Sequence, residues 1–116
     1  MARAGLFGQV RRAMANWERI LDAAEQLARQ LRGRDIDYNE AKKALDFYLA
    51  NGCDDRVMQD YLNLMATQPP ARSKQTRRYY QALRDVWSQW QPGLQGIDKA
   101  RAAGWALRMA TEKRGG

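Results

Sequence analysis

The amino-acid sequence predicts an all-α protein, a single compact bundle of about five helices. Apolar residues recur at spacings of three and four along almost the whole chain, the period of an amphipathic helix. The sequence lacks the alternating apolar and polar runs, separated by turn dipeptides, that are typical of β-strands. Its 116 residues suffice for one domain with one hydrophobic core. We therefore expect residues 1–116 to form one helical domain, with residues 1–10 and 112–116 as candidates for flexible ends.

The first predicted helix carries a long apolar stripe that is followed by Gly33. The stripe consists of Trp17, Ile20, Leu21, Ala24, Leu27, Ala28 and Leu31. Gly33 can adopt the left-handed conformation that ends a helix. The upstream residues 6–14 either extend this helix or fray, because Gly5 and Gly8 weaken its first turns.

The second predicted helix begins at Asp37. The Asp37 side chain can accept from the amide near Glu40, and Glu40 can reach back, which is a variant of the capping box. Asn51-Gly52 ends the helix. Its apolar stripe consists of Ala41, Ala44, Leu45, Tyr48 and Leu49.

The third predicted helix begins after Asp54 or Asp55, which are typical helix-capping residues. It ends before Pro69-Pro70, because a proline pushes the preceding residue out of helical geometry. Its apolar stripe consists of Val57, Tyr61, Leu62, Leu64 and Met65.

Two more helices complete the predicted bundle. Ser73 is a natural N-cap for the fourth helix, and Pro92-Gly93 ends it. The apolar face of the fourth helix consists of Tyr79, Tyr80, Leu83, Val86, Trp87 and Trp90. The last helix covers about 97–112, and its tightly packed small-residue face consists of Ile97, Ala100, Gly104, the flanking Trp105 and Leu107. The connections are short, so we expect neighbouring helices to run roughly antiparallel.

The charge is strongly positive and unevenly spread. The net charge is +7 and the sequence pI is about 10.0. Residues 1–34 contain seven basic and three acidic side chains, residues 35–68 three and seven, and residues 69–116 ten and three. An acidic block therefore lies between two basic ones. This balance favours an anionic partner, with nucleic acid first and an acidic membrane surface second, although a merely basic surface would also account for the net charge.

The densest basic cluster lies at the start of the fourth predicted helix. Lys74, Arg77, Arg78 and Gln81 follow the i, i+3, i+4, i+7 spacing of one helix face, and Arg84 continues it. Cations in the first turns of a helix are unfavourable unless an anion is nearby, which favours phosphate binding over a solvated surface. Arg72, just before the helix, belongs to the same cluster, and three cations of the last helix could extend the surface: Lys99, Arg101 and Arg108.

The sequence offers no catalytic centre, and we predict no catalytic residue, metal ligand or cofactor. It contains no histidine, so the usual neutral-pH general base is missing. Adjacent carboxylates such as Asp54 and Asp55 diverge on a helix, so capping is a better interpretation than metal binding. Cys53 is the only cysteine, which excludes an intrachain disulfide and indicates a small, partly buried filler. The four tryptophans and five tyrosines are mostly core, with Tyr79 or Trp90 as candidates for stacking on a base.

The sequence shows neither a signal peptide nor a membrane-spanning segment. The residues at 1–5 lack the apolar run of a signal peptide, and no stretch approaches the roughly 18 apolar residues of a membrane span. We therefore expect a cytoplasmic protein. A basic peripheral membrane protein is a weaker interpretation, because the basic face has no exposed apolar stripe beside it.

The segment 72–80, Arg-Ser-Lys-Gln-Thr-Arg-Arg-Tyr-Tyr, resembles a recurring segment of one protein family. This family is the small helical subunit of type III CRISPR effector complexes. Its members often carry a Ser/Thr-rich cap, then Gln, an apolar residue, Arg, a basic residue and two aromatics. Gln75, Arg77 and Arg78 stand at the polar and basic places, while Thr76 replaces the more usual aliphatic and Lys74 a frequent Ser.

The resemblance implies a non-catalytic subunit that lines the duplex of guide and target RNA and contacts its backbone without reading sequence. Its implied partners are that RNA, other subunits of the complex and further copies of the same chain. The acidic block would suit a contact with a basic neighbour, including the next copy. The expected RNA-binding residues are Arg72, Lys74, Gln75, Arg77, Arg78, Arg84, Arg101 and Arg108. The alternative is a stand-alone helical nucleic-acid-binding or adaptor protein.

Overall fold

The computed structural model describes residues 2–67 and 74–115, with side chains from 16 to 111 inside those ranges. The described residues form five helices and contain no strand, which confirms the predicted all-α class. The helices are α1 (Ala2–Arg32), α2 (Tyr38–Ala50), α3 (Asp55–Thr67), α4 (Lys74–Gln89) and α5 (Gly96–Gly115). The predicted cap at Ser73 and the stop at Pro69-Pro70 lie outside the described residues.

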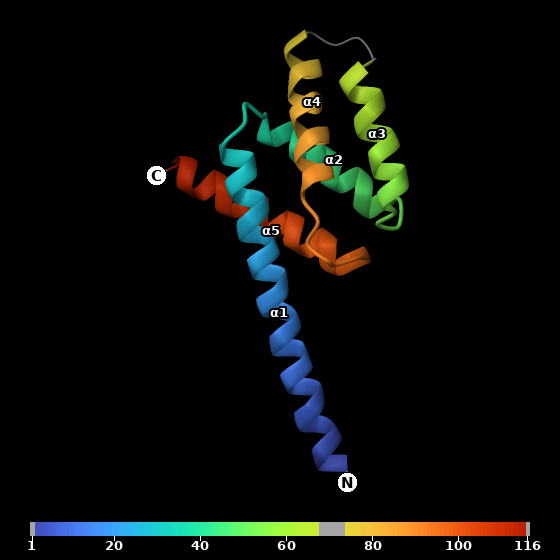
Figure 1. The fold of residues 1–116 in the computed structure, drawn as a ribbon, viewed down its shortest axis with the longest axis vertical. Helices are drawn as coiled ribbons and strands as arrows, with labels where there is room; N and C mark the ends of the chain where they lie inside the picture. The colour runs from blue at the N-terminus through green and yellow to red at the C-terminus, as the bar shows by residue number, and fades with distance from the viewer. Residues whose placement is uncertain (1, 68–73, 116) are drawn as a thin grey trace.

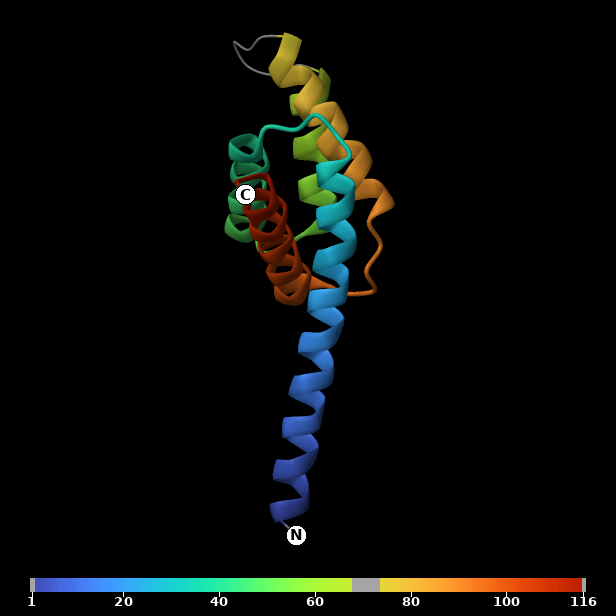
Figure 2. The ribbon, with the colours of Figure 1, turned by 90° about the vertical axis from the view of Figure 1, so that its left-hand side faces the viewer.

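The longest helix, α1, organises the arrangement. Its backbone is helical from Ala2 onward, so the upstream segment extends the helix, and its N-terminal turns reach beyond the other four helices (Figure 1). The C-terminal half of α1 packs most extensively on α5, while α3 packs on α4. In the side view the N-terminal turns of α4 lie at the top of the molecule, beyond the end of α1, whereas α5 lies beside the C-terminal half of α1 (Figure 2). This separation decides which basic residues can share a surface.

Chain neighbours are not always neighbours in space. Helices α3 and α4 run antiparallel, as expected for a short connection (Figure 1). The backbones of α1 and α2, and those of α4 and α5, have no close contact within the described residues, although Lys99 of α5 reaches the Trp87 ring of α4. Instead α1 and α5 run in the same general direction: Asn16 bonds Asp98 at 3.3 Å, and Arg32 donates to the Met109 carbonyl at 3.5 Å. The last helix therefore covers the first.

Small side chains line both of these helices. Their buried alanines are at most 5% exposed: Ala23, Ala24 and Ala28 on α1, and Ala100, Ala102, Ala103, Ala106 and Ala110 on α5. Alanines let two helix backbones approach closely, so the predicted small-residue face of α5 exists. Its predicted members differ, because Ile97 and Trp105 are 53% and 39% exposed. On α1, Trp17 and Leu21 are also exposed, since they flank the line of contact that begins near Asn16.

The helix ends depend on local hydrogen bonds. Asp37 caps α2 as predicted, although it accepts from the Asn39 amide at 2.8 Å, and Asp54 caps α3 by accepting from the Arg56 amide at 2.9 Å. Helix α1 ends at Arg32, directly before Gly33 as predicted, but Gly33 does not take the left-handed conformation, because only Gly52, Gly93 and Gly96 among the described glycines have positive φ. Cys53 also has a positive φ of 55° and is half-buried after Gly52, as a filler residue would be.

Glu40 does not complete the predicted capping box. Its carboxylate accepts a hydrogen bond from the Tyr80 hydroxyl of α4 at 2.7 Å. The Tyr80 hydroxyl also lies 3.4 Å from that of Tyr61 on α3, and Tyr61 stacks on Phe47 of α2 at a centroid distance of 4.2 Å. A side chain that could close a local cap instead links three helices.

A second polar cluster lies deeper, around Lys99 of α5. Lys99 is 7% exposed, and its ammonium lies 3.1 Å from a carboxylate oxygen of Asp55 at the start of α3. The other Asp55 oxygen accepts from the Tyr48 hydroxyl of α2 at 2.6 Å. The Lys99 ammonium also lies 4.2 Å from the ring centroid of Trp87 on α4, within cation–π range. The expectation that Lys99 extends a basic surface is therefore wrong, because its charge is used inside the fold.

The Lys99 cluster makes Asp55 a strong determinant of stability. We expect Asp55→Ala to lower the free energy of unfolding by about 1–2 kcal/mol, since it leaves a buried ammonium without its counter-charge, while water screens the half-exposed carboxylate. Urea denaturation measures this change. The control is Asp60→Ala on the exposed side of α3, which should shift stability by no more than about 0.5 kcal/mol. Equal effects of the two variants would contradict the role of Asp55.

Tyr80 should make the fold sensitive to alkali. Burial, followed by its hydrogen bonds to Tyr61 and Glu40, raises the pKa of the Tyr80 hydroxyl far above its ordinary value. An unfolded tyrosine ionises near pH 10, so this stabilisation is complete below about pH 10 and is lost as the pH rises further. We expect stability to fall above pH 10 by about 1.4 kcal/mol per pH unit for such a tyrosine, and Tyr80→Phe to reduce that slope. Denaturation curves between pH 8 and 11.5 test this, and an unchanged slope in the variant would exclude Tyr80 as the source.

Candidate nucleic-acid interface

Three exposed cations lie in the first turns of α4: Lys74, Arg77 and Arg78. Arg72, the fourth member of the predicted cluster, lies outside the described residues. No ion pair between described residues involves Lys74, Arg77 or Arg78, and the first turn of α4 contains no acidic residue. The free amides at a helix N-terminus add further positive potential at this end of α4. We call these three residues the α4 cation cluster.

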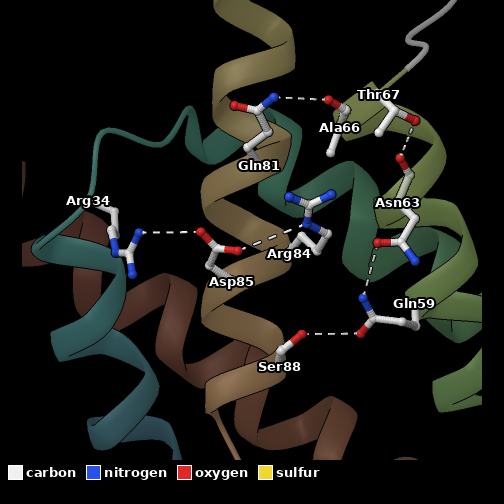
Figure 3. A network of polar contacts seen from close by, with 9 residues as sticks. All are labelled: Arg34, Gln59, Asn63, Ala66, Thr67, Gln81, Arg84, Asp85 and Ser88. Carbon is white, nitrogen blue, oxygen red and sulfur yellow. Dashed lines mark hydrogen bonds and ion pairs between the residues drawn. The ribbon is translucent and has the colours of Figure 1, made fainter.

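Beyond the cluster, the outward side of α4 is bonded to α3. Gln81 donates to the Ala66 carbonyl at 3.2 Å, and Ser88 lies 3.4 Å from Gln59, as Figure 3 shows. Gln81 is therefore half-buried against α3 and does not continue the row of exposed polar residues as predicted. These bonds hold α4 against α3 at two points after its N-terminal turns.

Arg84 differs from the cations of the cluster. Its Nε lies 3.9 Å from the carboxylate of Asp85, which also pairs with Arg34 after α1 at 3.7 Å (Figure 3). The Arg84 side chain is 32% exposed. The carboxylate partly neutralises the predicted extension of the basic row, so the uncompensated charge of α4 lies at Arg78 and before it.

The aromatic side chains of this region are mostly engaged in the fold. Gln75 donates to the Tyr79 hydroxyl at 2.7 Å, so this predicted RNA-binding residue is bonded within its own helix. Tyr79 is half-buried beside Asp35 and Asp37, in acidic surroundings. Trp90 is only 2% exposed and donates its indole N–H to the Ala23 carbonyl at 3.0 Å. Trp90 is therefore a core residue and is excluded as a stacking platform in this structure.

The two predicted cations of α5 lie on another part of the surface. Arg101 pairs with Asp98 at 3.4 Å, and the Arg108 guanidinium lies 5.3 Å from the ring centroid of Trp105. The N-terminal turns of α4 lie beyond the end of α1, away from α5 (Figure 2), and the backbones of α4 and α5 are not in close contact within the described residues. The predicted set therefore divides into two sites, and a ligand of α4 is not automatically a ligand of α5.

The α5 site contains a residue that the sequence interpretation placed at a packed face. Trp105 is 39% exposed and lines a hollow together with Arg101, Gly104 and Arg108. A signal for its exposure was present, because residues 97, 101, 105 and 108 follow the spacing of one helix face that carries two arginines. The buried alanines of α5 occupy the other face.

Comparisons with protein-family models, with curated proteins and with solved structures find no match for this chain. Within residues 2–67 and 74–115 no three His, Cys, Asp or Glu side chains cluster in a way that could hold a metal ion. In the same part of the chain no helix combines the length and the apolar character needed to cross a membrane. The function is therefore argued from the placement of individual side chains.

The two adjacent carboxylates allow a test for catalysis. Asp54 caps α3 and Asp55 pairs with Lys99, so we expect the purified protein to contain no stoichiometric divalent metal and to leave RNA intact. Metal analysis and an RNA cleavage assay with and without Mg²⁺ or Mn²⁺ measure this. Metal-dependent cleavage that co-purifies with the protein and is lost in Asp54→Asn would overturn the expectation.

Proposed function

We propose that this protein is a non-catalytic small subunit of a type III CRISPR RNA-guided effector complex and that it contacts RNA backbone. The α4 cation cluster carries the proposal. Its three side chains are exposed, lack carboxylate partners among the described residues and lie where the helix dipole is also positive. Such an arrangement repels itself in isolation and is relieved by phosphate oxygens.

The same cluster overlaps the segment that resembles the small-subunit family. Lys74, Arg77 and Arg78 lie on the first turns of α4, while Tyr80 of that segment is fully buried and bonded to Glu40. The segment thus combines an exposed basic part with an anchoring aromatic. This combination supports a role in which the bundle presents a rigid cationic edge to RNA.

The acidic middle of the chain supports assembly with basic neighbours. Asp46, Asp54 and Asp60 on or next to α2 and α3 are exposed, on elements other than those carrying the α4 cluster and the arginines of α5. A surface of one sign can pair with the opposite sign on another subunit, including another copy, in a head-to-tail arrangement that need not close into a ring. A single subunit would then bind RNA weakly, and the assembly would supply the remaining affinity through multivalency.

The central test removes two cations of the cluster. We expect Arg77→Ala/Arg78→Ala to weaken binding of unrelated RNA sequences by similar factors, because contacts to phosphate carry little sequence information. The dependence of log K on log salt should flatten by roughly one unit for each phosphate group that the variant no longer neutralises. Fluorescence anisotropy over a salt series, on the free protein and on the assembled complex, measures both quantities.

The matched control is Arg29→Ala/Arg56→Ala, which removes two exposed arginines from α1 and α3 and changes the net charge equally. It should leave the affinity and the salt slope nearly unchanged. Both double variants should keep stability within about 0.5 kcal/mol per exposed site. Unchanged RNA binding in the cluster variant, in both settings, would reject the α4 cation cluster as an RNA interface.

The genetic context and the native complex separate this proposal from a stand-alone nucleic-acid-binding or adaptor protein. We expect the gene to lie beside genes for guide-RNA processing and for backbone subunits, and the tagged protein to co-purify with a short guide RNA. A locus without such genes would contradict the CRISPR assignment. RNA binding through the α4 cation cluster would then favour the stand-alone protein.

A further inference from the structure

The exposed face of α5 forms a hollow that the fold does not fill. Trp105, Arg101, Arg108 and Gly104 line a surface hollow of about 300 Å³. Gly104 has no side chain, and a Cβ built there would lie 3.8 Å from the nearest atom of Leu45 on α2. Gly104 therefore lies against Leu45 of α2, at the boundary between the two helices.

This hollow adjoins a second one of about 390 Å³, because Gly104 and Arg108 line both. The second hollow lies between α2 and α5 and receives Lys42, Asn39 and the edge of Tyr38 from α2. Together they form a shallow, open groove along α5. We call it the α5 groove.

The chemistry of the α5 groove combines a flat aromatic surface with cations. Arg108 lies over the Trp105 ring at 5.3 Å, so the pair presents a planar guanidinium and a partly open indole face. Unpaired bases stack on indole rings and on guanidinium planes, while their phosphates pair with lysine and arginine. Lys42, Arg101 and Arg108 supply three positive charges, against Asp46 in the groove and Asp98 beside Arg101.

We propose that the α5 groove binds an unpaired nucleotide of single-stranded RNA, with its base on the Trp105–Arg108 pair and its phosphate toward Lys42 or Arg101. The inference rests on the proposed RNA-binding function and extends it. The α4 cation cluster binds backbone of any strand, whereas the α5 groove adds a preference for bases that are not paired. A duplex cannot use this groove, because its bases are stacked on each other.

The binding test compares a single-stranded RNA with a duplex of equal length. We expect Trp105→Ala to lower affinity for the single strand about tenfold, in line with the removal of one stacked base, and to change duplex affinity less than twofold. Trp105→Phe should retain most of the affinity. The matched control Trp17→Ala removes an indole of similar exposure from α1, outside the α5 groove, and should have no effect on either RNA.

A cross-link locates the binding site directly. RNA containing 5-bromouridine, irradiated on the wild-type protein, should label the tryptic peptide 102–108, which contains Trp105 and no other aromatic residue. Labelling of this peptide, together with selective loss of single-strand affinity in Trp105→Ala, supports the proposal. Absence of label on this peptide, or equal single-strand affinity of Trp105→Ala and wild type, overturns it.

The outcomes keep the two proposals apart. If Trp105→Ala binds like wild type while Arg77→Ala/Arg78→Ala binds weakly, the α5 groove is rejected and the α4 interface stands. If only Trp105→Ala weakens binding, the α4 interface is rejected. A variant that keeps RNA affinity but changes the sedimentation coefficient of the assembled complex would show that the α5 groove docks a protein, which also overturns the nucleotide proposal.

Discussion

The buried ammonium of Lys99 is the constraint on which the other packing contacts depend. It needs a counter-charge, and the carboxylate of Asp55 supplies one while also accepting the Tyr48 hydroxyl. It needs a polarisable surface, and Trp87 supplies one beside Trp90, whose indole N–H reaches a main-chain carbonyl of α1. One charge thus fixes how α2, α3, α4 and α5 meet and, through the two rings, how α4 meets α1. The buried ammonium tolerates few alternative arrangements, because a shift that breaks its pairing leaves a charge in an apolar interior.

With its interior fixed in this way, the chain can leave other charges uncompensated at the surface. Asp85 is shared between Arg84 and Arg34, so the C-terminal half of α4 is close to neutral on its outer side. The N-terminal half has no such carboxylate among the described residues. On α5 the two arginines lie beside Trp105 and Gly104, and not at a helix terminus. The two basic regions therefore differ in chemistry as well as in place, and each suits a different part of a polynucleotide.

The sequence predicted what depends on nearby residues and missed what depends on distant ones. Asp37 and Asp54 cap helices through amides two residues away, and such local geometry can be inferred from residue type alone. Glu40 was assigned to the same kind of local bond, but a hydroxyl forty positions away competes for it. Lys99 is predicted to be a surface cation, because the residues near it in the sequence do not indicate that it pairs with the carboxylate of Asp55, forty-four positions earlier. The candidate site divided in two for the same reason, since helical periodicity indicates faces and does not indicate which faces share a side of the molecule.

The pairing of the first helix with the last also bears on how the protein forms during synthesis. The apolar stripe of α1, which includes Ile20, Ala24 and Leu27, emerges from the ribosome well before its principal partner α5. The hairpin of α3 and α4 can assemble as soon as it is made, because its two helices are close in sequence. The stripe of α1 lacks this partner until α5 has been synthesised, which takes several seconds at about 5–20 residues per second. A nascent chain of this protein therefore exposes an amphipathic helix to chaperones, or to a partner subunit made nearby, before its own α5 can cover that helix.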